Sequence, residues 1–224
     1  MMRVLLVGAK GRMGQAVITA AEGNSGLTIS AKIERGDDIA SALSDCDVAI
    51  DFSTADATEA VARACAAKQK PLVLGTTGQS AAQKKTVAMA AREVPIVFAA
   101  NFSVGVNVLF ALTRRAAESL GENFDRDIIE MHHRTKKDAP SGTAKRLAEI
   151  LNEVSGKKMV DPLSIRAGDI VGEHTVIFSG TGERLELTHR AGSRATFAEG
   201  ALRAARWVVR QSAGLYSMED VLGL

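Results

Sequence analysis

A fifteen-residue stretch, EMHHRTKKDAPSGTA at positions 130–144, concentrates side chains that can bind anions and move protons. His132 and His133 are two of only four histidines in the chain, and Arg134 and Lys136 follow them closely. Imidazole titrates near neutral pH, with a pKa of about 6.5, and an ammonium group holds a carboxylate as a compact point charge. The stretch therefore predicts acid–base chemistry on an anionic substrate.

Two simpler interpretations of the histidine pair compete with this one: a solvated loop and a metal site. Adjacent histidines on a strand point to opposite faces, and no carboxylate or cysteine partner stands at ligand spacing, so no metal site is predicted. The turn that follows argues against a plain surface loop. Pro140 and Ser141 open a helix, with Ser141 as the expected N-cap, and the amides of a helix start bind anions.

The helix start alone is too weak to hold a doubly charged substrate. A helix terminus contributes about 0.3–1 kcal/mol to binding an anion, whereas a hydrogen bond to a charged group contributes about 1.5–3 kcal/mol. The lysines and histidines must therefore act together with the helix end. Such a combination is typical of a catalytic loop that binds carboxylates.

A second chemical signal lies near the N-terminus, where GAKGRMG places Gly8, Gly11 and Gly14 between an apolar run and a helical run. Glycines let a pyrophosphate approach the backbone, and the free N–H groups of the helix bind it. The spacing is G-x-x-G-x-x-G, with Lys10 in place of the second glycine of the common fingerprint. A turn of this kind can also be purely structural.

The residues that follow the second apolar run strengthen the prediction of a dinucleotide site. Glu34 stands twenty residues after Gly14, where a carboxylate accepts hydrogen bonds from ribose hydroxyls and repels the 2′-phosphate of NADP. Arg35 can stack on adenine or bind that same phosphate. The pair predicts NAD binding with some tolerance for NADP, although a solvated charge pair would look the same.

Short apolar runs alternate with helical stretches through the first hundred residues. This alternation predicts a doubly wound parallel sheet with right-handed crossovers. The expected strands are 3–7, 27–33, 46–52, 71–75 and 95–100, and the expected helices are 11–23, 56–69 and 80–94. GTTG at 75–78 and AANFSVGVN at 99–107 follow two of these strands, so they should lie at the same ligand-binding edge.

After Asn101 the pattern changes to that of an α+β domain. Helices are expected at about 104–120 and 143–156, strands at 163–168, 173–180 and 184–191, and the tail from Phe197 is expected to be helical. In the last strand Leu185, Leu187 and His189 alternate with polar residues, which predicts one buried face. The predicted division is 1–103, 104–190 and 191–224, the last part returning to the first domain.

Composition excludes several classes of protein. The chain has 224 residues, of which 46% are hydrophobic and 24% charged, and the net charge is only +2. No basic stripe predicts a nucleic-acid partner, and no apolar window predicts a membrane span or a signal peptide. Cys46 and Cys65 are expected to be buried free thiols in a reducing compartment. A cytoplasmic protein is predicted.

Taken together, the motifs resemble one family. GAKGRMG, DFS, GTTG, AANFSVGVN, EMHHRTKKDAPSGTA and HRAGSRATFAEGALRAARW are similar to the 4-hydroxy-tetrahydrodipicolinate (dihydrodipicolinate) reductases of lysine and diaminopimelate biosynthesis. The resemblance runs from Met2 to the C-terminus, and the stretch from Glu130 to Ala144 is its most specific part. It implies a Rossmann-like domain that binds NADH or NADPH, and a mixed-sheet domain that binds a small dicarboxylate substrate and builds a homotetramer.

The resemblance also implies roles for individual residues. His132 would be the proton donor and acceptor, Lys136 a second proton donor, and His133, Gly142 and Thr143 would bind the substrate. The cofactor would be held by Gly8, Ala9, Lys10, Gly11, Arg12, Met13, Glu34, Arg35, Gly75, Thr76, Thr77, Ala99, Ala100, Asn101 and Phe102. Thr54 departs from members that carry an arginine toward the 2′-phosphate, which favours NADH.

Two other functions fit parts of the sequence. A dehydrogenase of another small carboxylate would keep the fold but would not need the stretch from Glu130 to Ala144. A redox sensor that binds NADH would need the glycine turn but neither His132 nor Lys136. The residues alone do not decide whether His132 or Lys136 delivers the proton.

Overall fold

The computed structural model describes residues 1–156 and 160–224, which form two compact units. The first unit comprises Met1–Ser103 together with Ala195–Gly223, and the second comprises Val104–Arg194. No helix among the described residues is long and apolar enough to cross a membrane.

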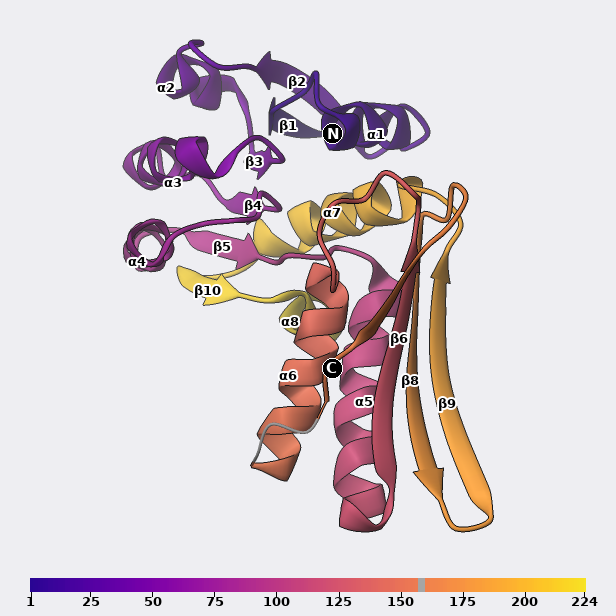
Figure 1. Ribbon diagram of the computed structural model, residues 1–224. Coiled ribbons are helices and arrows are strands. Elements are labelled where there is room, and N and C mark those ends of the chain that lie inside the picture. Colours follow the sequence, from indigo (N-terminus) through magenta and orange to yellow (C-terminus); the bar gives the residue numbers. More distant parts are fainter. Residues whose placement is uncertain (157–159) are drawn as a thin grey trace. The chain divides into compact units, whose positions relative to one another are not determined.

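The first unit is built on a six-stranded parallel sheet with the strand order β10-β5-β4-β3-β1-β2 (Figure 1). From β1 the chain passes to β2 on one side and then to β3 on the other, so the order reverses between β1 and β3. In open α/β sheets, ligands bind outside the carboxyl ends of the strands at such a reversal. The strands are β1 (Met2–Val7), β2 (Leu27–Ile33), β3 (Val48–Asp51), β4 (Leu72–Leu74), β5 (Pro95–Phe98) and β10 (Gly214–Tyr216).

Helices cover both faces of this sheet, because successive side chains of each strand point to opposite sides. Val4 and Leu6 of β1 belong to one apolar cluster, and Leu5 and Val7 belong to the other. The first cluster includes residues of α1 (Arg12–Glu22), α7 (Ala195–Val208) and α8 (Met218–Leu222), and the second includes residues of α3 (Thr58–Ala67) and α4 (Ala81–Ala90). The doubly wound fold is therefore confirmed, and Cys46 and Cys65 are buried free thiols as predicted.

The prediction of a wholly helical tail is wrong at Gly214–Tyr216. These residues form β10, which pairs in parallel with β5 and completes the sheet. Three residues are too few to show a strand period, and their partner lies more than a hundred positions away in the sequence. The segment from Glu34 to Asp51 holds the one-turn helix α2 (Ile39–Ala42), a 3₁₀ turn and the strand β3.

The second unit is a four-stranded mixed sheet with the order β7-β6-β8-β9. Its strands are β6 (Asp125–His132), β7 (Leu163–Arg166), β8 (Gly172–Gly180) and β9 (Glu183–Ala191), with β6 and β7 parallel and the other pairs antiparallel. Helices α5 (Val104–Leu120) and α6 (Gly142–Ser155) pack on one face, as Figure 1 shows. The even-numbered residues of β6 point into this packed face and are buried, so Glu130 and His132 are both directed inward.

The predicted buried face of residues 184–191 forms only in part. Leu187 packs at the border of the core under α5, but Leu185 is 39% exposed. The reason is that β9 is the edge strand of the sheet, and the helices cover the centre of the sheet better than its edge.

Candidate functional site

The glycine turn at the carboxyl end of β1 brings three backbone segments into close approach. Gly8 has a φ of +80°, which favours glycine, and a Cβ placed on it would lie 2.7 Å from the carbonyl oxygen of Phe52. A Cβ on Gly14 would lie 2.3 Å from the carbonyl oxygen of Gly8. Only glycine fits at these two positions, so the turn packs closely against the loop after β3 and against the start of α1.

A pocket of about 420 Å³ opens beside this turn, at the carboxyl ends of β1, β2 and β3. The structure brings the predicted residues Gly8, Gly11, Glu34 and Arg35 together in its lining. Oε1 of Glu34 accepts a hydrogen bond of 2.6 Å from the backbone N–H of Lys10, so the acid is attached to the glycine turn. The position, size and polar groups of this pocket fit the adenosine half of a dinucleotide.

Ala9 lies in the glycine turn, and Arg12 and Met13 begin α1. The other predicted cofactor residues follow the next two strands of the same sheet. Gly75, Thr76 and Thr77 come directly after β4, and Ala99, Ala100, Asn101 and Phe102 come after β5. Phe102 differs from the others because its side chain is buried in the core, with its ring 5.7 Å from that of Phe52. Only its backbone is available for a ligand.

Asp51 is a buried acid of this region that the sequence did not single out. Its Oδ1 accepts hydrogen bonds from the N–H of Ser53 at 2.8 Å and from the hydroxyl of Thr76 at 3.1 Å. Burial raises the pKa of Asp51 above its usual value, and these hydrogen bonds oppose the rise. The side chain therefore holds together the loops that follow β3 and β4.

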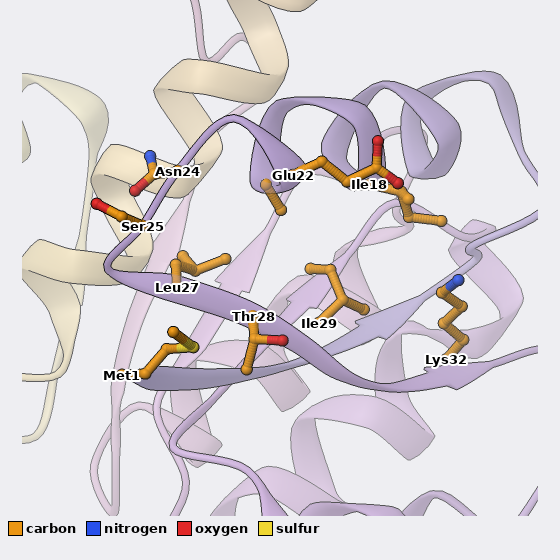
Figure 2. A pocket seen from close by; sticks show the side chains of 10 residues that line it. Met1, Ile18, Glu22, Asn24, Ser25, Leu27, Thr28, Ile29 and Lys32 are labelled. Atoms are coloured by element: carbon orange, nitrogen blue, oxygen red, sulfur yellow. The ribbon is translucent and has the colours of Figure 1, made fainter.

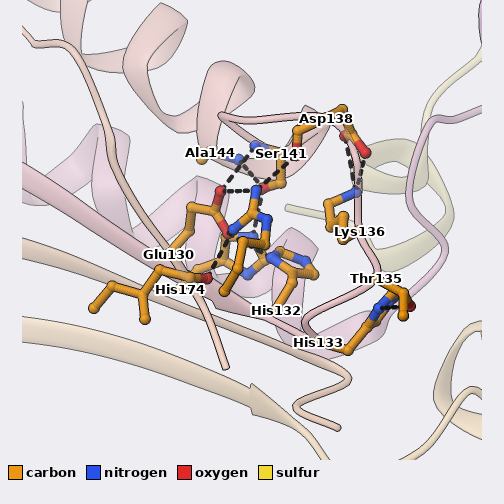
Figure 3. A network of polar contacts seen from close by, with 11 residues as sticks. Glu130, His132, His133, Thr135, Lys136, Asp138, Ser141, Ala144 and His174 are labelled. Atoms are coloured by element: carbon orange, nitrogen blue, oxygen red, sulfur yellow. Dashed lines mark hydrogen bonds and ion pairs between the residues drawn. The ribbon is translucent and has the colours of Figure 1, made fainter. Parts of the chain in front are cut away.

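The second unit holds a polar cluster around Glu130 and His132, which lie two residues apart on the inward face of β6 (Figure 3). Nδ1 of His132 lies 2.5 Å from Oε2 of Glu130. Arg166 of β7 donates through both terminal nitrogens to the same carboxylate, at 2.9 and 2.7 Å. The backbone N–H of Ser141 donates to Oε1 at 3.2 Å, and the side chain of Ser164 also hydrogen-bonds the carboxylate.

The charges in this cluster settle the protonation of its members. Burial disfavours the ionised form of Glu130, but the hydrogen bonds that it accepts, first among them those of Arg166, lower its pKa to about 2. Burial lowers the pKa of His132, and the positive charges of Lys136 and Arg166 act in the same direction against the pull of Glu130. At neutral pH the carboxylate is ionised and the free imidazole is mostly neutral.

Ser141 is the N-cap of α6, as predicted, since its hydroxyl oxygen accepts a hydrogen bond of 3.1 Å from the N–H of Ala144. The same hydroxyl lies 2.9 Å from Nε2 of His174 on β8. The ring of His174 meets the ring of His132 edge-on at 5.2 Å. Because burial lowers the pKa of His174 to about 4, this ring is neutral and shares one hydrogen bond with the Ser141 hydroxyl.

The loop between β6 and α6 carries the other predicted substrate residues. The ammonium of Lys136 contacts both carboxylate oxygens of Asp138 at 2.8 Å, and its charge acts on His132. Gly142 and Thr143 form the first turn of α6. His133 is set apart from the cluster, because its Nδ1 bonds the hydroxyl of Thr135 at 2.7 Å (Figure 3).

Three members of the cluster were missed as functional residues: Glu130, Arg166 and His174. The sequence interpretation found no carboxylate partner for the histidines, although Glu130 precedes His132 by two positions and so shares its face of a strand. That spacing was the available signal. Arg166 and His174 gave none, because they reach the cluster only through the pairing of β6 with β7 and β8.

We expect the free energy of unfolding to fall as the pH is lowered from about 6.5 to about 4. An unfolded histidine takes up a proton near pH 6.5, whereas folded His174 stays neutral down to about pH 4, so acid stabilises the unfolded chain. Above pH 6.5 the residue is neutral in both states and contributes no pH dependence. His174→Gln keeps a side chain that can hydrogen-bond Ser141, and it should make the loss between pH 7.5 and 4.5 smaller by about 2–3 kcal/mol, measured by denaturant unfolding. The same loss in both proteins would contradict this assignment.

A separate pocket of about 400 Å³ lies along the edge strand β2 (Figure 2). It begins at Met1 and Leu27, at the amino ends of β1 and β2, and includes Ile18 and Ile29. It contains none of the predicted site residues. Ligands of doubly wound sheets bind at the opposite, carboxyl ends of the strands, so the position of this pocket does not indicate a cofactor site.

Known proteins share both the sequence and the fold. The chain matches the family profiles described as dihydrodipicolinate reductase, N-terminus, over residues 2–102 and dihydrodipicolinate reductase, C-terminus, over residues 105–222. The 4-hydroxy-tetrahydrodipicolinate reductase of Akkermansia muciniphila is 47% identical over 243 aligned positions that cover 100% of this chain and 99% of the relative. That of Halorhodospira halophila is 44% identical and covers 98% of each chain.

The solved structures agree with the fold. A dipicolinate-bound dihydrodipicolinate reductase from Paenisporosarcina sp. TG-14 superimposes with a TM-score of 0.82 over 97% of each chain at 24% identity. A probable dehydrogenase from Thermotoga maritima reaches a TM-score of 0.70 at 11% identity, over 98% of this chain and 92% of its own. With both family profiles matched almost end to end and relatives above 40% identity over the whole length, this chain belongs to the dihydrodipicolinate reductase family.

Proposed function

We propose that the chain catalyses the NAD(P)H-dependent reduction of 4-hydroxy-tetrahydrodipicolinate to tetrahydrodipicolinate in lysine and diaminopimelate biosynthesis. The observation that carries the proposal is the cluster around His132, in which a buried carboxylate holds an imidazole next to a lysine and a helix start. Relatives that are 40–47% identical over the full chain bear the name of this reductase.

The cofactor pocket of the first unit supports the redox half of the reaction. Gly8, Ala9, Lys10, Gly11, Arg12, Met13, Glu34, Arg35, Gly75, Thr76, Thr77, Ala99, Ala100, Asn101 and Phe102 follow the carboxyl ends of its strands and would hold the dinucleotide. The bound dinucleotide supplies a hydride. The chain supplies backbone amides and the carboxylate of Glu34, which would accept hydrogen bonds from the ribose. Gly8 and Gly14 have no side chain, which keeps the turn compact.

The cluster of the second unit supports binding and protonation of the substrate. The substrate is a dianion, and His133, Gly142 and Thr143 would hold its carboxylates together with the charge of Lys136. The 4-hydroxyl leaves as water, and hydride addition to the conjugated ring leaves an electron-rich centre that must take up a proton. An anionic substrate raises the pKa of a nearby imidazole, so its arrival promotes protonation of His132, and Lys136 is a second proton donor.

The adenosine pocket favours NADH over NADPH. Glu34, Asp37 and Asp56 line it with negative charge, Arg35 is the facing cation and lies 3.8 Å from Asp56, and Thr54 adds no charge. A 2′-phosphate would be repelled by this set of carboxylates.

In Glu34→Gln the ratio of the dissociation constant for NADPH to that for NADH should therefore fall by about tenfold. This change corresponds to about 1.4 kcal/mol of lost charge repulsion. Dissociation constants for both dinucleotides, measured by fluorescence titration, give the ratio. Glu93→Gln, an exposed acid outside the pocket, is the matched control and should leave the ratio unchanged. A ratio that is equally unchanged in Glu34→Gln would show that this acid does not select the cofactor.

We further infer that the protein is a cytoplasmic homotetramer with domains at 1–103, 104–190 and 191–224. The open face of the second unit's sheet supports assembly, since Leu163 and Ile165 of β7 point to the side away from the helices and are 62% and 44% exposed. The helix that returns to the first unit begins at Ala195, close to the second boundary, at 190/191. Sedimentation velocity measures the mass of the assembly.

The activity is tested by following the absorbance of NADH and of NADPH while the cyclic imine is generated from pyruvate and aspartate semialdehyde. Oxidation that requires both precursors is the expected result. If the cofactor binds but is not oxidised, the chain acts on another small carboxylate through the same fold. If the cofactor binds and no carboxylate is reduced, a redox sensor becomes the better description.

A further inference from the structure

We propose that Glu130, held by Arg166, is a positioning residue that keeps the hydrogen of neutral His132 on Nδ1 and so makes Nε2 the atom that exchanges the proton. The inference rests on the proposed function, in which His132 is the acid–base residue. It adds the partner of that residue, the atom that acts and the reason why Arg166 is needed.

The hydrogen-bond pattern around Glu130 leaves a single arrangement of protons. An ionised carboxylate only accepts hydrogen bonds. Arg166 donates to both of its oxygens and the N–H of Ser141 donates to Oε1, which anchors the carboxylate from two elements outside β6. The side chain of Ser164 also hydrogen-bonds the carboxylate, and His132 contacts it at 2.5 Å through Nδ1. Nδ1 must therefore carry a hydrogen, and the lone pair of the neutral ring lies on Nε2.

Nε2 points to the start of β8, where the chain has a glycine. A Cβ on Gly172 would lie 3.0 Å from Nε2 and 3.3 Å from Cδ2 of His132. Gly172 does not adopt a positive φ, so its backbone does not demand glycine. The missing side chain instead leaves room beside the atom that this assignment makes reactive.

Because Arg166 offsets the charge of Glu130, the carboxylate orients the imidazole of His132 without fixing a positive charge on the ring. A lone buried carboxylate would stabilise the imidazolium strongly. Here the guanidinium of Arg166 neutralises Glu130, and Lys136 adds a further positive charge. His174 faces the ring as a neutral group, and Asp138 is paired with Lys136. The ring is held in place without being fixed in its charged form.

The first test uses the unmodified protein and needs no substrate. In protein labelled with ¹⁵N-histidine, long-range ¹H–¹⁵N correlation spectra distinguish the two tautomers of each neutral ring. The signals of His132 are assigned by their disappearance in His132→Gln. At pH 8 we expect hydrogen on Nδ1 and none on Nε2. Hydrogen on Nε2 would overturn the proposal, whether or not the chain proves to be a reductase.

The second test replaces Glu130 by its amide. In Glu130→Gln the amide oxygen should accept the hydrogen bonds of Ser141 and Arg166, which turns the amide N–H₂ group toward His132. Because that group donates, Nδ1 must accept, and the ring hydrogen should move to Nε2. We expect kcat to fall by about 10²- to 10⁴-fold with a smaller change in KM, as for other catalytic imidazoles whose orienting carboxylate is amidated. The spectra should show the changed tautomer in the same variant.

Glu153→Gln is the matched control, because Glu153 is also held by two arginines, Arg114 and Arg146, but lies exposed on α6 and touches no histidine. Its kcat and the tautomer of His132 should stay as in the unmodified chain. If Glu130→Gln retains kcat, or loses kcat while Nδ1 keeps its hydrogen, the proposal is wrong. Gly172→Ala is a second variant that leaves the ion pair intact, and it should lower kcat by crowding Nε2; unchanged kcat would argue against Nε2 as the reacting atom.

Discussion

Replacing His132 by glutamine should lower kcat for the cyclic imine by about 10²- to 10⁴-fold, which is the usual contribution of a positioned acid or base. His132 is 9% exposed and its neighbours are polar, and glutamine can donate to Glu130 in place of Nδ1. The fold should therefore persist while proton transfer is lost. Steady-state oxidation of NADH with imine made in situ measures kcat, and titration of the cofactor shows whether the first unit remains intact.

His189→Gln serves as the control for the loss of a histidine. His189 lies on the edge strand β9, opposite His174 of β8, and packs beside Gly105. Its kcat should remain within about threefold of the unmodified chain. A comparable loss in both variants, or a loss below about tenfold in His132→Gln, would move the acid–base role to another group, with Lys136 as the first candidate.

Replacing Lys136 by methionine should lower kcat/KM for the imine by about 10²- to 10³-fold while leaving NADH affinity unchanged. Methionine keeps the apolar stem, so the change removes the charge. One lost hydrogen bond between charged groups accounts for about 1.5–3 kcal/mol, or roughly 10- to 150-fold, and a share in proton donation accounts for the rest. In the free chain the ammonium is paired with Asp138 at 2.8 Å, so a substrate carboxylate competes with that acid.

Two measurements separate the roles of Lys136. A rise in KM with unchanged kcat would assign it to carboxylate binding alone, and a fall in both would add proton donation. Lys137→Met, the same change at an exposed neighbour, should reduce kcat/KM by less than about threefold, because solvent and salt screen its charge. Loss of NADH affinity in Lys136→Met would contradict the placement of the cofactor in the first unit.

The sequence by itself determined those parts of the protein that depend on residues adjacent in the chain. The strand from Leu27 to Ile33 and the helix from Val104 to Leu120 were predicted at their observed bounds, because apolar periodicity is a local property. The glycine turn at Gly8 and the N-cap at Ser141 were likewise predicted from the sequence, since each depends on backbone geometry within one turn.

Only the tertiary structure decided how the acid–base group is held. Arg166 lies 36 positions after Glu130, and it joins the carboxylate only because β7 pairs in parallel with β6. His174 reaches Ser141 across 33 positions through β8. The strand β10 and the exposure of Leu185 have the same origin, because a sheet assigns central and edge places to strands by long-range pairing. A local pattern can name the residues that carry the chemistry, but their partners depend on which strands become neighbours.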